Sequence, residues 1–349
     1  MYTRLKEVNI KSSLNSRVFT QFLARDVEVR LQRDNVKKFI VLNMVDNSTI
    51  EEARLFNASE DQIEIIKNGG VYNAAVDVKP YDKSPTGYSC IIYNIEESSE
   101  PPDSFVEWED GLENCKSTIE NILGDIINTP YGLIAYKIII KYWDKFSVWT
   151  AAKRHHHIQL GGLLKHTAEV VETVEIISDY YSGLYGEDFI NKPLLMASAV
   201  IHDVGKVKEL EVERLSGSTD YSCEASLSTH IMNVLSDVEV TAYELGIGVQ
   251  TYKVNELNEE EPIKSKEQLE EEIESVNLLR HVLASHHGKL EWGSPITASI
   301  PEAVILHKMD EISADMYKFN KIMNEIEPGE SYSEWYNGDI RKVYKEKSK

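Results

Sequence analysis

The first hundred residues alternate short β-rich runs with turn-forming residues. Within the runs, apolar and polar positions alternate or β-branched and aromatic residues predominate, as is typical of strands with one buried face. Five runs can be distinguished between Phe19 and about Glu97: FTQFLARDVEVRL, KKFIVLNMVD, STIEEARLF, GGVYNAAVDVK and GYSCIIYNI. Five strands at this spacing predict a small closed β-barrel, with a brief helical turn near residues 59–67 between the third and fourth strands.

Beyond residue 110 the spacing of apolar positions changes to that of helices. Helices are predicted over residues 112–127, 131–146, 162–181, 192–202, around 230–235, 276–287 and 301–319. Pro301 suits the first turn of a helix, and Gly288 suits the residue just beyond a helix end. We therefore expect the second part of the chain to be all-α.

With 349 residues, the chain is long enough for two domains. The patterns predict a multidomain α and β protein, and an oligonucleotide-binding barrel (OB-fold) is the leading interpretation of the five strands. The acidic, proline-containing stretch EESSEPPDSFVEWEDG has no sustained apolar period, as is typical of a linker. The expected parts are a nucleic-acid-binding barrel at 1–97, an acidic linker and connecting helix at 98–130, and an all-α domain at 131–349.

The formal charge of −21 excludes a general nucleic-acid coat, because non-specific binding of phosphates needs a basic surface. Within residues 1–45, however, nine basic residues stand against four acidic ones. The candidates for contact with a phosphate backbone are Arg25, Arg30, Arg33, Lys37 and Lys38. The candidates for stacking on bases are Phe19, Phe22, Phe39, Phe56, Tyr72 and Tyr88. The alternatives are a solvated strand face for the basic residues and the barrel core for the aromatic ones.

Other features narrow the class of protein. The most apolar stretch, residues 131–143, is interrupted by Lys137 and Lys141, so that no membrane-spanning helix and no membrane partner are predicted. The first residues lack the apolar core of a secretory signal, and the three scattered cysteines form no disulfide framework, so that we expect a cytoplasmic protein. The acidic segment 237–275 is interpreted as a solvated loop or surface helix.

All ten histidines lie between His155 and His307, within the predicted helical part. The informative fragments are GGLLKHTAEVV, AVIHDVGKVKEL, LSTHIM, LASHHGKLEWGSP and ILHKMDEI. A single histidine in an apolar helix is more often a packed core residue than a ligand. In LMASAVIHDVGK, however, an aspartate follows a histidine at the end of an apolar helix, where burying its charge is unfavourable without a partner. A divalent cation would supply that partner, and the fragments together predict a metal site.

The order of these fragments resembles the HD phosphohydrolase superfamily, an all-α fold that binds divalent metal through histidine, histidine-aspartate and a distal aspartate. Within it, the chain resembles the bacterial YhaM-type 3′-5′ exoribonucleases, most strongly from about residue 151 to residue 344. The supporting stretches are AAKRHHHIQLGGLLKHT, IHDVGKVKEL, LLRHVLASHHGKLEWGSP, EAVILHKMDEISADM and EPGESYSEWYNGDIRKVY. In that family an OB-fold barrel precedes the HD domain, which agrees with the strand pattern found here independently.

The resemblance implies two divalent ions, which together can activate a nucleophile and neutralise a phosphodiester. The expected ligands are His166, His202, Asp203 and Asp310 for the first ion and His230, His286 and His287 for the second, with Asp203 bridging them. Imidazole and carboxylate ligands without thiolate favour Mn²⁺, Fe²⁺, Co²⁺ or Zn²⁺, and the resemblance favours manganese. Ser313 departs from the family pattern, in which an aspartate tends to occupy that place, so the role of that aspartate is not assigned to it.

Three further residues near the expected ligands are assigned roles. Lys206 lies just beyond the histidine-aspartate pair and could reach a substrate phosphate as a point charge, unless it only caps a helix. His157 precedes the helix of the first ligand and is a candidate for contact with nucleic acid. His307 lies one helical turn before the last ligand and could orient a ligand from behind.

The leading hypothesis is a metal-dependent 3′-5′ exonuclease that hydrolyses single-stranded RNA. Whether it also hydrolyses DNA is left open by the sequence. The direction of attack is implied by the resemblance alone. One alternative is an HD-type phosphohydrolase of nucleotides or cyclic dinucleotides, and another is a non-catalytic regulator that binds nucleic acid. Assembly into a homo-oligomer is left open by the sequence.

Overall fold

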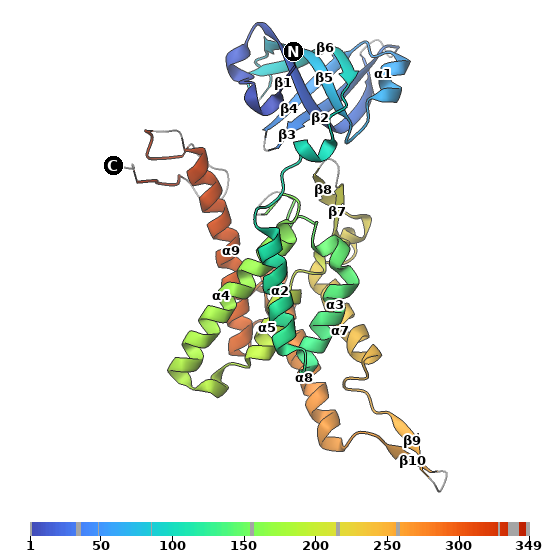
Figure 1. Ribbon diagram of the computed structural model, residues 1–349, viewed down its shortest axis with the longest axis vertical. Helices are drawn as coiled ribbons and strands as arrows, with labels where there is room; N and C mark the ends of the chain where they lie inside the picture. The colour runs from blue at the N-terminus through green and yellow to red at the C-terminus, as the bar shows by residue number, and fades with distance from the viewer. Residues whose placement is uncertain are drawn as a thin grey trace. The chain divides into compact units, whose positions relative to one another are not determined.

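The computed structural model describes residues 2–32, 36–47, 49–84, 86–153, 157–213, 217–255, 259–326, 329–333 and 342–346. The chain divides into two compact units, Met1–Trp108 with Val212–Ser218, and Glu109–Glu211 with Thr219–Lys349. The first unit is a β-barrel and the second is helical (Figure 1). This arrangement confirms the predicted fold class.

The barrel consists of β2 (Ser16–Leu31), β3 (Lys38–Asp46), β4 (Thr49–Phe56), β5 (Val71–Pro80) and β6 (Tyr88–Glu97). The strands follow the order β2-β3-β4-β6-β5, and antiparallel pairing of β5 with β2 closes the barrel. β4 and β6 pair in parallel, whereas the other pairs among these five strands are antiparallel. With the short helix α1 (Glu60–Ile65) between the third and fourth strands, this is the architecture of an OB-fold.

One long strand makes the closure possible. The first half of β2 pairs with β5, and its second half pairs with β3. The register against β3 shifts between Arg25 and Glu28, which marks a bulge that bends the strand. Phe22 and Tyr72 lie in the core, and the Tyr72 hydroxyl donates to Ile65 O (2.8 Å), which holds the end of α1 against the barrel.

The segment after β6 is partly integrated into the barrel unit. Phe105 is fully buried, and its carbonyl accepts from Asn47 N (2.8 Å). The Arg4 guanidinium lies 3.5 Å from the centroid of the Phe105 ring and also pairs with the buried Asp46. The first residues of the expected linker therefore pack on the barrel.

The helical unit contains α2 (Leu112–Ile126), α3 (Pro130–Phe146), α4 (Gly162–Tyr185), α5 (Lys192–Ile201), α6 (Lys206–Glu209), α7 (His230–Glu244), α8 (Lys266–Ser285) and α9 (Pro301–Glu325). Several helices begin where the sequence carries start signals. The side chains of Thr129, Asn191 and Thr229 cap α3, α5 and α7, and Pro301 occupies the first turn of α9 as predicted.

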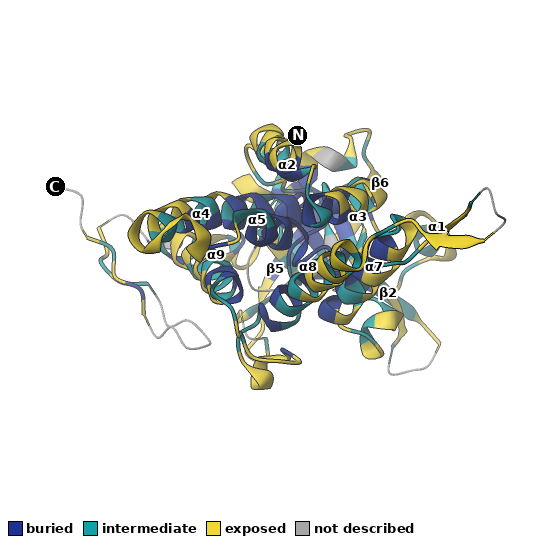
Figure 2. Cartoon of the chain, turned by 90° about the horizontal axis from the view of Figure 1, so that it is seen from below, coloured by how far each residue is buried: buried dark blue, intermediate teal, exposed yellow. Residues whose placement is uncertain are grey.

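The centre of this unit is α5, whose residues from Leu194 to Ile201 are all buried. It packs against α2, α3, α4, α8 and α9. Figure 2 shows α5 as a dark, buried helix among neighbours whose outer faces are exposed. A helix that is apolar on all sides can only occupy such a position.

α8 begins at Lys266, ten residues before the expected start, and Ser265 and Gln268 form a capping box there. Part of the acidic segment is therefore helical, which is one of the two interpretations given for it. Two short hairpins are also present: β9 (Tyr252–Val254) with β10 (Glu260–Pro262) in the helical unit, and β7 (Leu210–Glu213) with β8 (Ser218–Tyr221), of which Val212–Ser218 belongs to the first unit.

The remaining short elements are β1 (Thr3–Arg4) and the 3-10 turns η1 (Leu5–Glu7), η2 (Lys11–Ser13), η3 (Pro102–Phe105), η4 (Glu187–Phe189), η5 (Cys223–Ser226) and η6 (Leu290–Trp292). Among the described residues, no helix combines the length and the apolar character needed to cross a bilayer.

Candidate metal centre

The centre is built around the residues that follow α5. His202 is fully buried and Asp203 is 2% exposed, because the apolar helix before them lies in the core. The chain turns at this point, and Lys206 N donates to Asp203 O (3.0 Å). Polar side chains at such a depth need partners, since burying them without any is unfavourable.

Gly205 allows this turn to approach the start of α7. A Cβ atom on Gly205 would lie 2.1 Å from the carbonyl oxygen of His230, a main-chain atom that cannot rotate aside. Only glycine therefore permits this close packing. The glycine of the HDVGK fragment thus determines how near His230 comes to Asp203.

A first group of possible metal ligands comprises His166, His202 and Asp203. His166 lies on α4, and its Nε2 is 3.4 Å from His202 Nε2 and 3.4 Å from Asp203 Oδ2. Asp310 on α9 adds a second carboxylate, with Oδ1 3.1 Å from His166 Nε2 and 3.9 Å from His202 Nε2. Four predicted ligands thus meet although 144 positions separate the first from the last.

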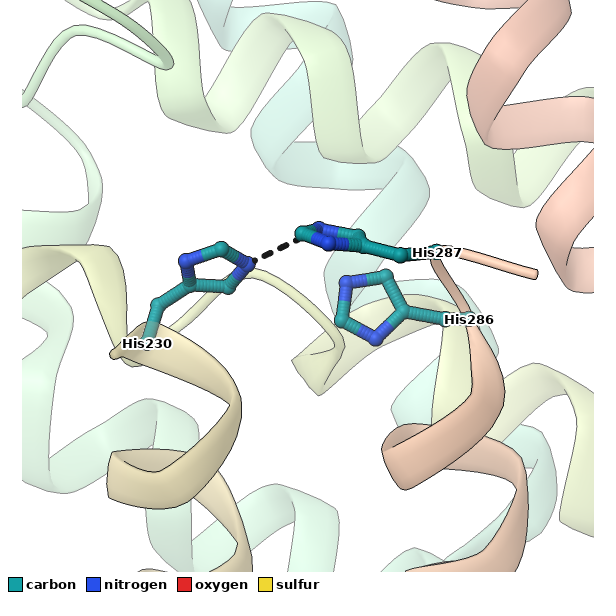
Figure 3. A group of neighbouring side chains, drawn as sticks. All are labelled: His230, His286 and His287. Carbon is teal, nitrogen blue, oxygen red and sulfur yellow. Dashed lines mark hydrogen bonds between the residues drawn. The ribbon is translucent and has the colours of Figure 1, made fainter. Parts of the chain in front are cut away.

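A second group comprises His230, at the start of α7, with His286 and His287, which follow α8 (Figure 3). The Nε2 atoms of His230 and His287 lie 3.1 Å apart. Asp203 lies between the groups, since its Oδ1 is 3.6 Å from His230 Nε2 and 4.0 Å from His286 Nε2. All seven expected ligands are thus brought together, with Asp203 between the two groups.

Main-chain carbonyls fix the orientation of three of the imidazoles. The Nδ1 atoms donate outwards, from His202 to Ala199 O (2.8 Å), from His286 to Leu283 O (2.7 Å) and from His287 to Trp292 O (2.8 Å). A carbonyl can only accept, so the proton of each neutral ring lies on Nδ1. The Nε2 atom of each ring therefore presents a lone pair to the centre.

Side chains hold the other two imidazoles in the same orientation, with Nε2 towards the centre. His230 Nδ1 donates to Glu209 Oε2 (2.5 Å). His166 Nδ1 lies 3.1 Å from Ser313 Oγ, whose own hydroxyl donates to Glu169 Oε2 (3.1 Å), so that Ser313 accepts from His166. Outer partners of this kind are usual for metal-binding histidines.

This donor set fits a cation. The Nε2 atom of His286 is buried and has no hydrogen-bond partner among the described residues. Burial opposes a charge on His202, but Asp203 and Asp310 outweigh it and raise the pKa of His202. Burial likewise opposes the charge of Asp203, yet Lys206 and the imidazoles hold the pKa of Asp203 well below its usual range. The lone pairs and carboxylates of the centre therefore favour a cation placed between them.

Lys206 supplies a fixed positive charge at the edge of the centre. Its Nζ lies 2.6 Å from Asp203 Oδ2, and only 13% of its side chain is exposed. Burial disfavours this charge, but the attraction of Asp203 exceeds that effect and raises the pKa of Lys206. Together with His230 and His287, Lys206 also lines a cavity of about 540 Å³.

His157 does not lie where it could contact a nucleic acid, contrary to the expectation from the sequence. This residue is 1% exposed, and its ring lies between two carboxylates, 3.1 Å from Glu109 Oε1 and 3.2 Å from Glu169 Oε2. A buried ring with both nitrogens so occupied cannot reach a nucleic acid, which corrects that assignment. Glu169 instead connects His157 through Ser313 to the ligand His166.

The buried His157 predicts a pH-dependent stability. Burial disfavours its charge, but Glu109 and Glu169 outweigh this and raise its pKa above the ordinary 6.5. The ion pairs therefore stabilise the fold fully below pH 6.5, and this contribution is lost as the pH rises through the higher folded-state pKa. We expect His157→Gln to lower the free energy of unfolding more at about pH 6 than at about pH 9, as measured by urea titration. An equal loss at both pH values would contradict a charged His157.

The other histidines lie around the centre or outside the described residues. His307 Nδ1 donates to His286 O (2.9 Å), so that it contacts the main chain of an expected ligand from behind. The Nε2 atom of His281 accepts from Ser299 N (3.0 Å). His155 and His156 fall among the residues that the structure does not describe.

Sequence reasoning missed the outer partners Glu169, Glu209 and Ser313. A signal was present for two of them, since Glu169 and Ser313 each lie three positions after an expected ligand on the same helix. Residues at this spacing share a helix face. Glu209 had no such signal, because a turn and a hairpin separate it from His230.

The expected phosphate contacts of the barrel are largely paired with acids. The pairs are Arg25 with Asp26 (3.4 Å), Arg30 with Glu28 (2.5 Å) and Lys38 with Glu60 (2.9 Å). Lys37 is exposed, and Arg33 lies outside the described residues. These residues occupy β2, β3 and the connection between them, but acidic neighbours reduce the positive potential there.

The expected stacking residues divide into two classes. Phe22 and Tyr72 are buried in the core, and the Tyr88 hydroxyl donates to Glu51 (2.8 Å). Phe39 and Phe56 face each other across β3 and β4, with stacked rings whose centroids are 5.6 Å apart. Phe56 is 42% exposed, and Phe19 on β2 is 52% exposed. Two of the six aromatic candidates, Phe19 and Phe56, are therefore exposed on strands, and Phe39 is half-buried beside Phe56.

No model of a known protein family matches the chain. Curated proteins named 3′-5′ exoribonuclease YhaM do match it. The one from Bacillus subtilis (strain 168) is 29% identical over 318 residues, which cover 89% of each chain. The one from Listeria welshimeri is 32% identical over 234 residues, covering 66% of this chain and 64% of the other. The resemblance to the YhaM-type exoribonucleases is thereby confirmed.

Two solved structures are similar to parts of the chain. The second OB-fold domain of replication protein A from Methanococcus maripaludis is 16% identical with a TM-score of 0.21, covering 29% of this chain and 97% of that domain. A replication protein A heterotrimer bound to single-stranded DNA is 18% identical with a TM-score of 0.23, covering 33% of this chain and 29% of the other.

Proposed function

We propose, from its similarity to the proteins named 3′-5′ exoribonuclease YhaM, that the chain is a metal-dependent 3′-5′ exonuclease acting on single-stranded RNA. The observation that carries the proposal is the convergence of five imidazole Nε2 atoms and two carboxylates in one buried centre. Such a set of donors suits phosphodiester hydrolysis and has no evident structural purpose, since apolar packing would stabilise the core better.

In this proposal the protein holds two divalent ions. His166, His202, Asp203 and Asp310 would bind one ion, His230, His286 and His287 would bind the other, and Asp203 would bridge them. Nitrogen and oxygen donors without thiolate suit Mn²⁺, Fe²⁺, Co²⁺ or Zn²⁺, of which we favour Mn²⁺. When bound, the ions would activate water and neutralise the phosphate.

The protein's own groups have separate tasks. Glu209 and Ser313 would keep the Nε2 atoms of His230 and His166 directed at the centre, because they hold the opposite ring nitrogens. Lys206 would attract the scissile phosphate, since its ammonium group borders both Asp203 and the cavity. These groups are fixed before substrate arrives, which reduces the reorganisation needed for reaction.

The decisive experiment measures metal content and activity on the same protein. We expect purified protein loaded with Mn²⁺ to retain about two ions per chain and to shorten a 5′-labelled RNA oligomer from its 3′ end. Excess EDTA should remove both the ions and the activity, and added Mn²⁺ should restore both. Undiminished cleavage in EDTA would refute the metal mechanism, and hydrolysis of free nucleotides alone would favour the alternative phosphohydrolase.

For the barrel, we propose that it guides the single strand by stacking bases on aromatic rings, one exposed (Phe56) and one half-buried beside it (Phe39). Phe39 and Phe56 are the best candidates, because the second and third strands of an OB-fold form its usual binding face. Replacing both by alanine should weaken RNA binding by about 5- to 100-fold, as loss of stacking does, while hydrolysis of a small chromogenic phosphodiester is unchanged.

The matched control for this experiment is Tyr93→Ala. Tyr93 is 69% exposed on β6, beyond the positions at which β6 pairs with β4, and its ring contacts the Arg17 guanidinium (4.0 Å) and not the Phe39–Phe56 pair, so its loss should leave affinity near that of the wild type. Binding is measured by fluorescence anisotropy with labelled single-stranded RNA and DNA. If the double variant and the control bind equally well, the assigned face is wrong.

A further inference from the structure

The cavity beside the metal centre has a second wall that the proposed chemistry does not use. Its volume is about 540 Å³, and four of its lining residues belong to the expected centre or contact it: Lys206, Glu209, His230 and His287. The remaining lining residues, here called the second wall, are Ala151, Ala152, Lys153, Leu210 and Tyr221. The second wall thus combines an aromatic ring, an ammonium group and small apolar residues.

Hydrogen bonds hold this second wall in place. The loop after α3 is tied to the β7–β8 hairpin by Trp149 Nε1 donating to Leu210 O (2.9 Å), by Thr150 Oγ1 with Thr219 Oγ1 (3.1 Å) and by Lys153 Nζ donating to Asp220 Oδ1 (2.5 Å). Ser222 adds two more, from its N to Glu209 O (2.9 Å) and from its Oγ to Lys208 O (2.7 Å). A wall fixed in this way can position a ligand without first becoming ordered.

Tyr221 is the distinctive feature of this wall. It is 58% exposed, although large aromatic side chains are commonly buried. The Lys153 ammonium lies 5.8 Å from the centroid of its ring, and 29% of the Lys153 side chain is exposed. An accessible ring next to a cation suits a ligand that has both a flat face and a negative charge.

The charges of the cavity also favour an anion. Lys153 and Lys206 both line it, and Glu209 is the acidic residue among the lining side chains. Glu209 accepts from both the main-chain N (2.9 Å) and the Nδ1 (2.5 Å) of His230, which occupy its carboxylate. Its negative charge is therefore largely compensated. Lys153 and Lys206 each have a carboxylate neighbour, Asp220 (2.5 Å) and Asp203 (2.6 Å), so an incoming phosphate would share the two ammonium groups with these acids.

We propose that this cavity binds the 3′-terminal nucleotide of the strand, with the base stacked on Tyr221 and the phosphate between Lys153 and Lys206. The inference rests on the proposed exonuclease function and adds the subsite that recognises the chain end. The cavity volume lies in the lower half of the range of ligand pockets, about 300–1,000 Å³, which suits one nucleotide and not a duplex end. Stacking accepts every base, so the subsite would recognise a terminal base without selecting its identity.

The test compares two RNA oligomers that differ only in whether the 3′-terminal residue carries a base or is abasic. For the wild-type protein with Mn²⁺, the terminal base should lower KM by about 5- to 100-fold, the range expected for one stacking contact, with little change in kcat. Tyr221→Ala should reduce this preference to about twofold or less, whereas Tyr221→Phe should retain it because the ring is preserved.

Tyr252→Ala is the matched control, since Tyr252 is similarly exposed (60%) but lies on β9, outside the cavity lining. It should show the full preference for the terminal base. If Tyr221→Ala keeps the full preference as well, or if the wild type shows none, the subsite is wrongly assigned. Far-ultraviolet circular dichroism and thermal melting of each variant separate a local effect from a loss of folding.

A second readout separates this inference from the proposed function. The same two oligomers, labelled at the 5′ end, are bound to the full-length protein in EDTA, where the proposed cleavage is absent. The base should again improve affinity, and Tyr221→Ala should remove the improvement. Loss of cleavage in all metal conditions with this base preference intact would refute the nuclease proposal and leave the subsite standing. Cleavage that does not depend on Tyr221 would refute the subsite and leave the nuclease proposal standing.

Discussion

Replacing Asp203 with asparagine is expected to lower RNA hydrolysis by about three orders of magnitude or more. Its two oxygens face different groups, with Oδ2 near His166 and Oδ1 near His230, so that one substitution affects both proposed ion sites. The amide also removes the negative charge that holds Lys206. Affinity for a single-stranded oligomer should change little, because the exposed aromatic residues of the barrel are untouched.

Two measurements check this expectation. The rate of shortening of a 5′-labelled RNA should fall, and the manganese content per chain should fall with it. Asp315→Asn is the matched control, since Asp315 lies on α9 near Asp310 but is 48% exposed and pairs with Lys318. It should keep both activity and metal. Unchanged turnover by Asp203→Asn would reject the bridging role.

Replacing Gly205 with alanine is expected to lower activity by at least about 100-fold and to destabilise the fold by about 1–3 kcal/mol. The added Cβ would lie 2.1 Å from His230 O and 2.8 Å from the carbonyl carbon. Because these are main-chain atoms, relief requires that the turn after α5 and the start of α7 move apart. His230 would then leave its place near Asp203.

Gly124→Ala serves as the control for the Gly205 experiment. Gly124 lies inside α2, and nothing lies within 4 Å of the position of its added Cβ. This substitution should stabilise the fold by about 0.5–1 kcal/mol, because alanine loses less conformational freedom in a helix. Urea titration and RNA cleavage assays measure both variants. A Gly205→Ala protein with the stability and activity of the wild type would show that the close approach is not required.

The sequence predicted the kinds and order of the elements because periodicity reports which face of a segment is buried. It therefore placed the five barrel strands and most of the helices. It did not place the start of α8 at Lys266, because the first half of that helix is rich in glutamate and buries no residue, so that Leu269 and Ile273 gave only a weak apolar signal. It also missed the hairpin of β9 and β10, whose residues are all exposed. Segments without a buried face carry little periodic signal.

The expected ligands could be named from short fragments and a resemblance. The residues that contact them could not be predicted in this way. His157 looked like a candidate for contact with nucleic acid, whereas packing buries it between Glu109 and Glu169. Ser313 was assigned no role because it departs from the family pattern, yet it contacts His166. Such contacts depend on how helices far apart in sequence face each other, and this information is not present in any single segment.

The seven donors are distributed over α4, the turn after α5, α7, the end of α8 and α9, so no fragment of the helical unit contains a complete centre. A growing polypeptide would acquire the centre only after Asp310 has emerged and α9 has docked. Because an unfolded chain offers no preformed site, the free energy of ion uptake would add directly to the folding equilibrium and raise the melting temperature of the whole unit. Cellular metal supply would then influence how long the protein survives, as well as how fast it works.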